Sequence, residues 1–277
     1  MIVRVLLGAL CGAALFVAPA FAEEPQPAAE PQDQDGWAFN MTTYLWTPGI
    51  SGDATIKGQK ADVDSSFIDI VKDTDTIFAY NGQLGVSKGD FSVLFSPTYM
   101  KLTASDHVAT GAGRARIDTD VELTYLELAG LYRIGAWTVG YNKTAPQTLS
   151  IEPLAGVRYT RLKGDLDVNV SGVPGKASRD GTRDWVDPIV GMRSILNVTD
   201  DIAFTVRGDV GGFGVGSDFT WQLASNLSYR FTLFNKEARA FAGYRALYQH
   251  YKDGSGNNKF EWDTTLYGPI LGLSITF

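Results

Sequence analysis

FTWQLASNLSYRF, residues 219–231, is the stretch that decides the fold, because its chemistry alternates from one residue to the next. One set of alternate residues is apolar apart from Ser225, and the other set is polar apart from Ala224. A period of two is typical of a β-strand with two different faces. The apolar face has aromatic residues at both ends, Phe219 and Phe231 outermost, as expected where a strand crosses a bilayer between two aromatic girdles. In the alternative, a soluble secreted β-sandwich that binds a ligand, this face would pack against a second sheet.

The same alternation recurs on both sides of this stretch, in segments long enough to cross a bilayer as tilted strands. We expect ten strands, at 37–47, 76–87, 91–103, 117–134, 149–164, 184–198, 202–212, 218–231, 238–252 and 260–277. The phase of the alternation shifts at Tyr125 and Leu126, which predicts a β-bulge or a membrane boundary. The predicted fold is an all-β, antiparallel, up-and-down transmembrane barrel of ten strands, or of twelve if segment 48–75 holds another hairpin.

The connections between these strands fall into two classes. Short turns are expected at 88–90, 199–201 and 232–237, and longer loops at 48–75, 104–116, 171–183 and 253–258. Because outer-membrane barrels have short periplasmic turns and longer outer loops, the short turns are assigned to the periplasm. Residues 65–73 read SSFIDIVKD, which predicts a short serine-capped helix, placed either on top of the barrel or as a plug in its mouth.

Composition agrees with a barrel and excludes two other classes of protein. Glycine, at 30 of 277 residues, is more frequent than in an average protein. Mean hydropathy is −0.06, and no run of eighteen apolar residues occurs beyond residue 22, which argues against a bundle of membrane helices. With 44% hydrophobic and 20% charged residues, the chain is also unlike a disordered protein.

The N-terminus predicts export. Residues 1–22 have a basic start, an apolar stretch and an Ala-Phe-Ala exit, which together indicate a signal peptide. Residues 23–36 form an acidic, proline-rich segment expected to be a disordered periplasmic tail. Removal of residues 1–22 deletes Arg4 and no acid, which leaves 24 − 1 = 23 basic and 31 acidic residues and a net charge of −8. A nucleic-acid partner is therefore disfavoured, since phosphate binding requires a basic face.

Cofactor and metal chemistry have little support in the sequence. The only cysteine, Cys11, lies in the predicted signal peptide, so the mature chain has no thiolate ligand or nucleophile. Asp-x-Asp pairs occur in the predicted outer loops and strand tops, but no twelve-residue calcium loop does, and solvated acids are the favoured interpretation. We predict no cofactor and no metal site.

The C-terminal segment and three internal stretches resemble known proteins. Residues 267–277 end in alternating apolar residues and a terminal Phe277, which is similar to the signature by which the barrel-assembly machinery recognises outer-membrane barrels. With this ending, WVDPIVGMR at 185–193, RGDVGGFGVGSDFTW at 207–221 and AGYR at 242–245 resemble a family of uncharacterised proteobacterial outer-membrane β-barrels. The resemblance implies a barrel fold in the outer membrane, with lipid and lipopolysaccharide as neighbours. It implies no activity and leaves the oligomeric state open.

A short internal repeat supplies the candidate site residues. IEPLAGVR at 151–158 and VDPIVGMR at 186–193 each place an acid and an arginine six residues apart, so both side chains point to the same, inward face. If the two strands pair antiparallel, Glu152 comes near Arg193 and Arg158 near Asp187. Adding the other charged residues that share the inward phase of their strands gives a predicted lumen network of Glu152, Arg158, Asp187, Arg193, Arg207, Asp209, Arg230 and Arg245.

This network has two interpretations. It could be the charged constriction of a narrow passive diffusion channel, or a salt-bridge network that fills the interior of a structural envelope protein. The second is favoured, because ten strands enclose little space and the opposing charges look balanced. A barrel hydrolase or lipid-modifying enzyme is a further alternative, with His250 beside Asp253, or His107 beside Asp106, as its candidate base. No catalytic residue is predicted, because neither histidine lies in a recognisable catalytic pattern.

Overall fold

A computed structural model describes residues 36–277 apart from 57, 111–112, 143–144 and 171–175. Only the backbone is described at 106–110, 113–115, 117, 142, 145, 166, 168–170 and 176–180. The predicted signal peptide, and the predicted tail up to residue 35, lie outside the described residues.

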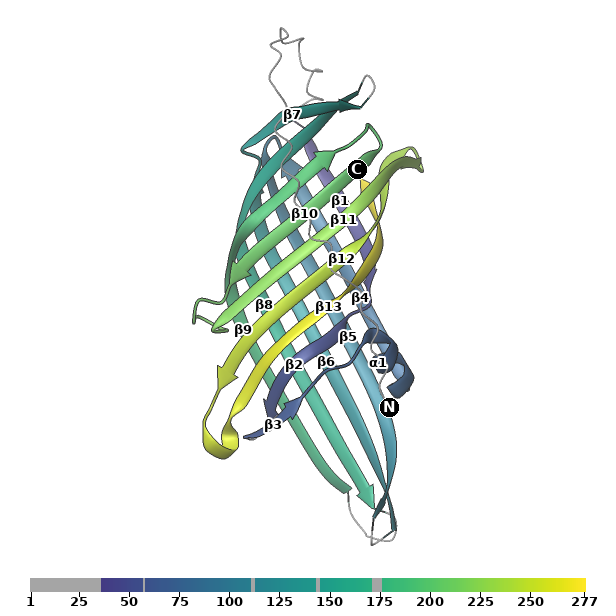
Figure 1. Cartoon of the computed structure of the whole chain (residues 1–277), viewed down its shortest axis with the longest axis vertical. Helices are drawn as coiled ribbons and strands as arrows, with labels where there is room; N and C mark the ends of the chain where they lie inside the picture. The colour runs from purple at the N-terminus through teal and green to yellow at the C-terminus, as the bar shows by residue number, and fades with distance from the viewer. Residues whose placement is uncertain (1–35, 57, 111–112, 143–144, 171–175) are drawn as a thin grey trace, which may run out of the picture. The chain divides into compact units, whose positions relative to one another are not determined.

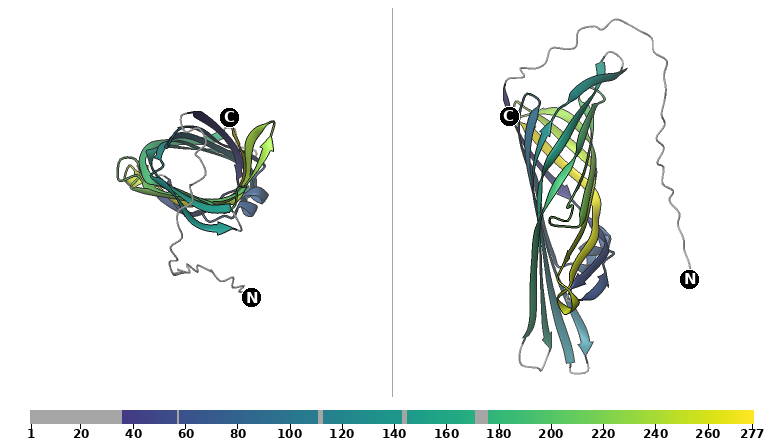
Figure 2. Two further views of the ribbon diagram at one scale, coloured as in Figure 1. Left: turned by 90° about the horizontal axis from the view of Figure 1, so that it is seen from above. Right: turned by 90° about the vertical axis from the view of Figure 1, so that its left-hand side faces the viewer.

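Ten antiparallel strands form a closed ring, as predicted (Figure 1; Figure 2, left). Each pairs with the next strand of the ring, and the last pairs with the first, so the ring has no free edge where all ten strands overlap. The ring order is β1 (Trp37–Trp46), β4 (Thr76–Lys88), β5 (Phe91–Thr110), β6 (Gly113–Tyr132), β8 (Ala145–Val170), β9 (Lys176–Asn197), β10 (Ile202–Gly211), β11 (Phe219–Leu233), β12 (Lys236–Asp253) and β13 (Phe260–Thr276). The fold class is confirmed, and with it the count of ten.

Segment 48–75 does hold a hairpin, but the hairpin does not enlarge the ring. β2 (Gly49–Ile56) pairs with the part of β13 that lies beyond the end of β1, and β3 (Gln59–Asp62) pairs with β2. Gly268 allows the bend between β1 and β2, because a Cβ atom there would collide with the backbone carbonyl of Thr47.

The predicted short helix is present as α1 (Phe67–Asp73), capped by the Ser66 hydroxyl, which accepts from the Asp69 N–H at 3.3 Å. It lies beside β2 at the periphery of the wall, and not in the mouth of the barrel (Figures 1 and 2). No helix among the described residues is long and apolar enough to cross a membrane.

The two ends of the barrel differ, and the predicted loops at one of them were wrong. What we term the short-turn end carries the two-residue turns Gly89–Asp90 and Phe234–Asn235 and the turn at 198–201. What we term the long-hairpin end carries the tips of β5–β6 and β8–β9, where residues 104–110, 113–116 and 176–183, predicted as loop, are strand. There β8 also continues past its predicted end at residue 164 to Val170. Residues 165–170 read DLDVNV and continue the alternation of β8, whereas 104–116 and 176–183 contain few apolar residues and lack it. Backbone pairing does not need an apolar face.

Two further strand predictions need correction. β7 (Gly135–Asn142) was not predicted, and it pairs with the first residues of β8 as a hairpin at the short-turn end (Figure 1). The bulge expected at Tyr125 and Leu126 is absent, because both residues keep one continuous register with β5 and with β8. Tyr125 faces inward and is buried, so the apparent phase shift came from an apolar residue pointing into the barrel.

The two faces of the barrel wall carry the reverse of the usual arrangement in a soluble protein, with apolar side chains outside and charged side chains inside. Outward-facing side chains are mostly large and apolar, and they are exposed, among them Leu223 at 51% and Phe204 at 39%. Inward-facing arginines and acids are buried or nearly so, including Arg158 and Asp209. The alternative of a soluble sandwich required these apolar residues to be covered by a second sheet, and the closed single ring contradicts it.

Candidate functional site

One row of directly paired residues crosses six neighbouring strands inside the barrel. From β8 to β13 it reads Glu152, Arg193, Arg207, Ala224, Arg245 and Gly268. Period-two geometry points all of them into the lumen. The row places three arginines along one line of the inner wall, with a single alanine between two of them.

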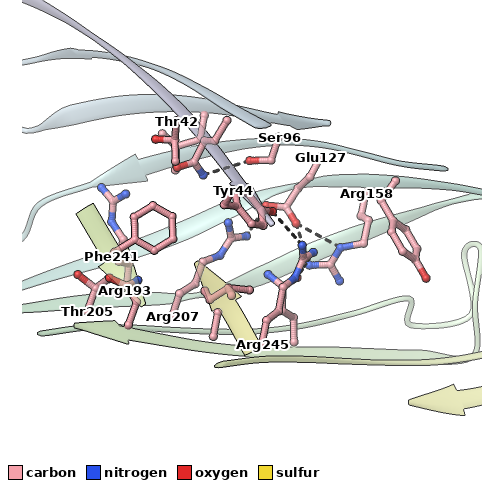
Figure 3. A pocket seen from close by; sticks show the side chains of 17 residues that line it. Thr42, Tyr44, Ser96, Glu127, Arg158, Arg193, Thr205, Arg207, Phe241 and Arg245 are labelled. Carbon is pink, nitrogen blue, oxygen red and sulfur yellow. Dashed lines mark hydrogen bonds and ion pairs between the residues drawn. The ribbon is translucent and has the colours of Figure 1, made fainter. Parts of the chain in front are cut away.

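Two arginines and two acids form a buried quartet beside this row. Arg158 lies 2.8 Å from Glu127 and 2.7 Å from Asp209 through its Nη2. Arg207 lies 2.5 Å from Glu127 and 3.1 Å from Asp209. Each carboxylate thus contacts both guanidinium groups, so the four charges cancel. Figure 3 shows the Arg158, Arg207 and Glu127 side chains reaching into the same space from their different strands.

The internal repeat places its four charges opposite one another, but only one of the two expected ion pairs forms. Glu152 and Arg193 are cross-strand partners with an ion pair of 2.5 Å. Arg158 and Asp187 are also cross-strand partners, yet the ion-pair partners of Arg158 among the described residues are Glu127 and Asp209. The expected Arg158–Asp187 pair is therefore wrong.

Asp187 is satisfied by the connection between β10 and β11. It accepts from the Ser217 backbone N–H at 2.6 Å, the Ser217 hydroxyl at 2.8 Å and the Trp185 indole N–H at 3.1 Å. Nothing in the repeat itself could show that this connection folds onto β9. Glu127 was missed for a related reason, because its strand was thought to change phase two residues earlier.

Two members of the predicted network have other neighbours. Arg230 lies at the short-turn end, 3.5 Å from Asp201 and 3.8 Å from Glu237, and is not part of the central network. Arg245 is nearly fully buried, and its contacts are Gln222, the Tyr44 hydroxyl at 3.1 Å and the Trp46 ring, whose centroid lies 4.5 Å from the guanidinium carbon. Among the described residues Arg245 has no ion-pair partner.

A cavity of ≈ 160 Å³ lies in front of the arginine row and is lined by Arg158, Arg193, Arg207 and Arg245 (Figure 3). Glu127 is the one acid in its lining. Side-chain exposure falls with depth from the short-turn end, from 20% and 11% for Arg193 and Glu152, through 12% and 5% for Arg207 and Glu127, to 0% for both Arg158 and Asp209. Water therefore reaches this cavity from the short-turn end.

Toward the long-hairpin end, large apolar side chains gather inside the ring. We use the term apolar layer for the buried cluster Trp46, Met100, Leu123, Tyr125, Leu247, Leu266 and Ile270. These side chains come from β1, β5, β6, β12 and β13, and they pack together inside the ring. A second cluster lies beyond, where the rings of Trp185 and Tyr251 stack with centroids 4.2 Å apart, against Phe260 and Trp262.

Hydrogen bonds bridge the ring at the level of the apolar layer. The Tyr125 hydroxyl of β6 donates to Gln249 Oε1 of β12 at 2.9 Å. Four strands separate β6 from β12 on either side of the ring, so this bond spans opposite walls. The Gln249 amide in turn donates to the Thr160 hydroxyl of β8 at 2.8 Å. Side chains from three strands thus meet across the lumen.

His250 has other acidic neighbours than the sequence suggested for a catalytic base. His250 contacts Asp218 at 3.6 Å and Glu261 at 3.3 Å, and not the Asp253 that the sequence suggested. The His107 side chain lies outside the described residues. Within the part of the chain that the structure describes, no group of three or more His, Cys, Asp or Glu side chains is arranged to hold a metal ion.

Comparison with known proteins yields structural matches only. No protein-family model and no curated protein sequence matches the chain. Ail of Yersinia pestis is 12% identical, with a TM-score of 0.33, over 88% of this chain and 99% of Ail. Neisserial surface protein A is 12% identical (TM-score 0.31, 88% and 100%), and a Pseudomonas aeruginosa FadL homologue is 11% identical (TM-score 0.30, 88% and 90%). None of these values assigns the chain to a family.

Proposed function

We propose that this protein is an outer-membrane β-barrel whose lumen is closed by its own side chains, and that it serves as a structural component of the envelope. The observation that carries the proposal is the hydrogen bond between Tyr125 and Gln249, because it joins opposite walls of the ring within the apolar layer. An open diffusion channel needs a continuous water-filled path at every level.

The outer wall supports the membrane location. Its exposed side chains include Phe39, Leu84, Phe95, Leu128 and Leu227, which would be costly to keep in water as a continuous surface. In lipid the same surface is favourable, and within the closed ring each strand has a hydrogen-bonded neighbour on both sides. Lipid and lipopolysaccharide are therefore the proposed neighbours of this wall, and the predicted signal peptide would bring the chain to them.

The C-terminus supports assembly in this location. Phe277 exchanges backbone hydrogen bonds with Phe39 of β1, so the terminal residue lies at the seam that closes the ring. Its side chain is 56% exposed at the short-turn end. We propose that this side chain is the group recognised by the barrel-assembly machinery before the seam closes.

Closure of the lumen is also supported on the short-turn side of the apolar layer. The quartet of Arg158, Arg207, Glu127 and Asp209 joins β6, β8 and β10 and narrows the interior from one side. Two unlike obstacles thus follow one another along the axis, one of ion pairs and one of apolar side chains. The proposal includes no catalytic residue.

Conductance of the refolded protein in planar bilayers tests this function. The expected result is silence at high salt and high voltage, with insertion shown separately by flotation with lipid vesicles. Discrete conductance steps from the wild-type protein would contradict a closed lumen and support the narrow channel instead. A carbonate wash of cell envelopes tests the location, since a protein held by its lipid-facing wall stays in the pellet and release into the wash would contradict it.

A further inference from the structure

We propose that the cavity in front of the arginine row binds a small oxyanion, which is a phosphate or carboxylate group. The oxyanion would lie between the side chains of Arg207 and Arg245, over the small side chain of Ala224. This inference rests on the proposed closed barrel, because the apolar layer makes the cavity a blind vestibule open only from the short-turn end. The ligand would enter from that side and remain bound, and would not pass through.

The arginine row leaves a gap of suitable width. Arg207 and Arg245 both pair directly with Ala224, one on each side. Neighbouring strands are about 4.8 Å apart, so the two arginine Cα atoms lie roughly 10 Å apart with only a methyl group between them. All three residues line the cavity (Arg207 and Arg245 are labelled in Figure 3).

Charge at this gap is positive. Arg158 and Arg207 are balanced by Glu127 and Asp209, and Arg193 is balanced by Glu152. Arg245 is the remaining cation that lines the cavity, and its direct contacts among the described residues are all with neutral groups. Glu127 interacts with it electrostatically but forms its ion pairs with Arg158 and Arg207. A nearly buried cation without a directly contacting acid is unfavourable, and a bound anion would remove this cost.

Asp187 does not supply the missing charge. It is fully buried, accepts three hydrogen bonds from Ser217 and Trp185, and is not among the residues that line the cavity.

Hydrogen-bond donors remain free for a ligand. A guanidinium group has five N–H bonds, and the contacts of Arg245 to Gln222 and Tyr44 use three of them. The Tyr44 hydroxyl accepts from Arg245, so its own O–H is left to donate to another group. The planar fork of a guanidinium group matches carboxylate and phosphate oxygens, which favours an oxyanion over a spherical ion.

Space is sufficient for such a ligand. A cavity of ≈ 160 Å³ is several times the volume of about 30 Å³ that one water molecule occupies in the liquid. A single phosphate or carboxylate group with a few waters therefore fits, whereas Phe241, Leu94 and Ile270 in the lining limit its size.

Titration calorimetry of the full-length mature barrel in detergent tests the proposal, with inorganic phosphate and acetate as probes and chloride at equal ionic strength as reference. We expect one site per barrel for phosphate or acetate. Arg245→Gln should weaken binding roughly 10- to 100-fold, as expected for loss of a charged hydrogen-bond donor. Chloride binding of equal strength would overturn the assignment to an oxyanion, and so would unchanged affinity in the variant.

A space-filling variant keeps the test informative if Arg245→Gln fails to fold. Ala224→Leu retains every charge but occupies the gap, and should abolish phosphate and acetate binding. Ala242→Leu, on the exposed outer face of the neighbouring strand, is the matched control and should bind as the wild type does. Equal binding by both leucine variants would place the anion elsewhere.

The outcome is separable from that of the conductance test. Absence of binding in a protein that is silent in bilayers contradicts the anion site alone. Conductance steps contradict the closed barrel, whatever the calorimetry shows.

Discussion

The two halves of the lumen are built on the same strands with the same inward phase, yet one is dominated by charged side chains and the other by large apolar ones. The half toward the short-turn end holds the arginine row, three acids and a cavity that water reaches. The half toward the long-hairpin end holds the apolar layer and a second aromatic cluster, both buried. The outer wall is apolar around the first half, whereas beside the apolar layer it carries Glu122, which pairs with Lys101 and Lys163.

This difference shows that an inward position in a barrel is not by itself a polar position. Where water fills the lumen, inward residues must be polar, as in the arginine half. Where side chains from opposite walls meet, water is excluded and the interior packs like the core of a soluble protein. A barrel of ten strands is narrow enough for side chains to fill its interior at one level and to leave a small water-filled space at another.

The largest expected effect is in the arginine half. Arg158→Met leaves Glu127 and Asp209 buried with one cation in place of two, and should lower the free energy of unfolding by about 3–5 kcal/mol. Urea unfolding in lipid vesicles, followed by tryptophan fluorescence, measures the change. An unchanged midpoint would mean that the quartet is solvated, and that the two halves do not differ in burial.

A smaller loss is expected in the apolar half. Leu247→Ala should leave a cavity in the apolar layer and cost about 2–5 kcal/mol in the same unfolding assay. The control is Leu227→Ala on the exposed outer wall, where lipid can fill the space that is left. Equal losses in the two variants would show that the layer is not packed as a core.

The bridge between opposite walls should contribute less. Tyr125→Phe removes the hydrogen bond to Gln249 and keeps the ring, so we expect a loss of about 1 kcal/mol. Gln249 retains its bond to Thr160, which limits the effect. Tyr229→Phe on the exposed outer wall is the matched control, and the bridge is refuted if the two variants unfold alike.

The smallest effect is expected at the rim of the arginine half. Arg230→Met breaks ion pairs with Asp201 and Glu237 that are exposed, and should cost less than about 1 kcal/mol. Both Arg230→Met and Arg158→Met remove an arginine paired with two acids, so the difference between their losses of stability measures the effect of burial. A loss as large as that of Arg158→Met would show that exposure does not distinguish the two sites.

The repeat at 151–158 and 186–193 shows how far sequence reasoning reached into the site. Its spacing placed Glu152 opposite Arg193 and Arg158 opposite Asp187, and the register has both pairings. Spacing fixes which Cα atoms are neighbours in a strand pair, because the period is two. It does not fix which charged groups meet, since the long side chain of Arg158 reaches Glu127 and Asp209 on other strands.

Alternation along residues 219–231 and nine similar segments was enough to determine the barrel, its ten strands and its apolar outer face, because a one-residue slip would exchange the two faces of every strand. Tertiary structure alone decided that Tyr125 meets Gln249, that Ser217 folds onto Asp187 and that Ala224 opens a gap between two arginines. The physical reason is that the sheet closes into a ring. Which side chains meet across the ring depends on the diameter of the barrel and on the stagger between neighbouring strands, and the period of a single strand encodes neither.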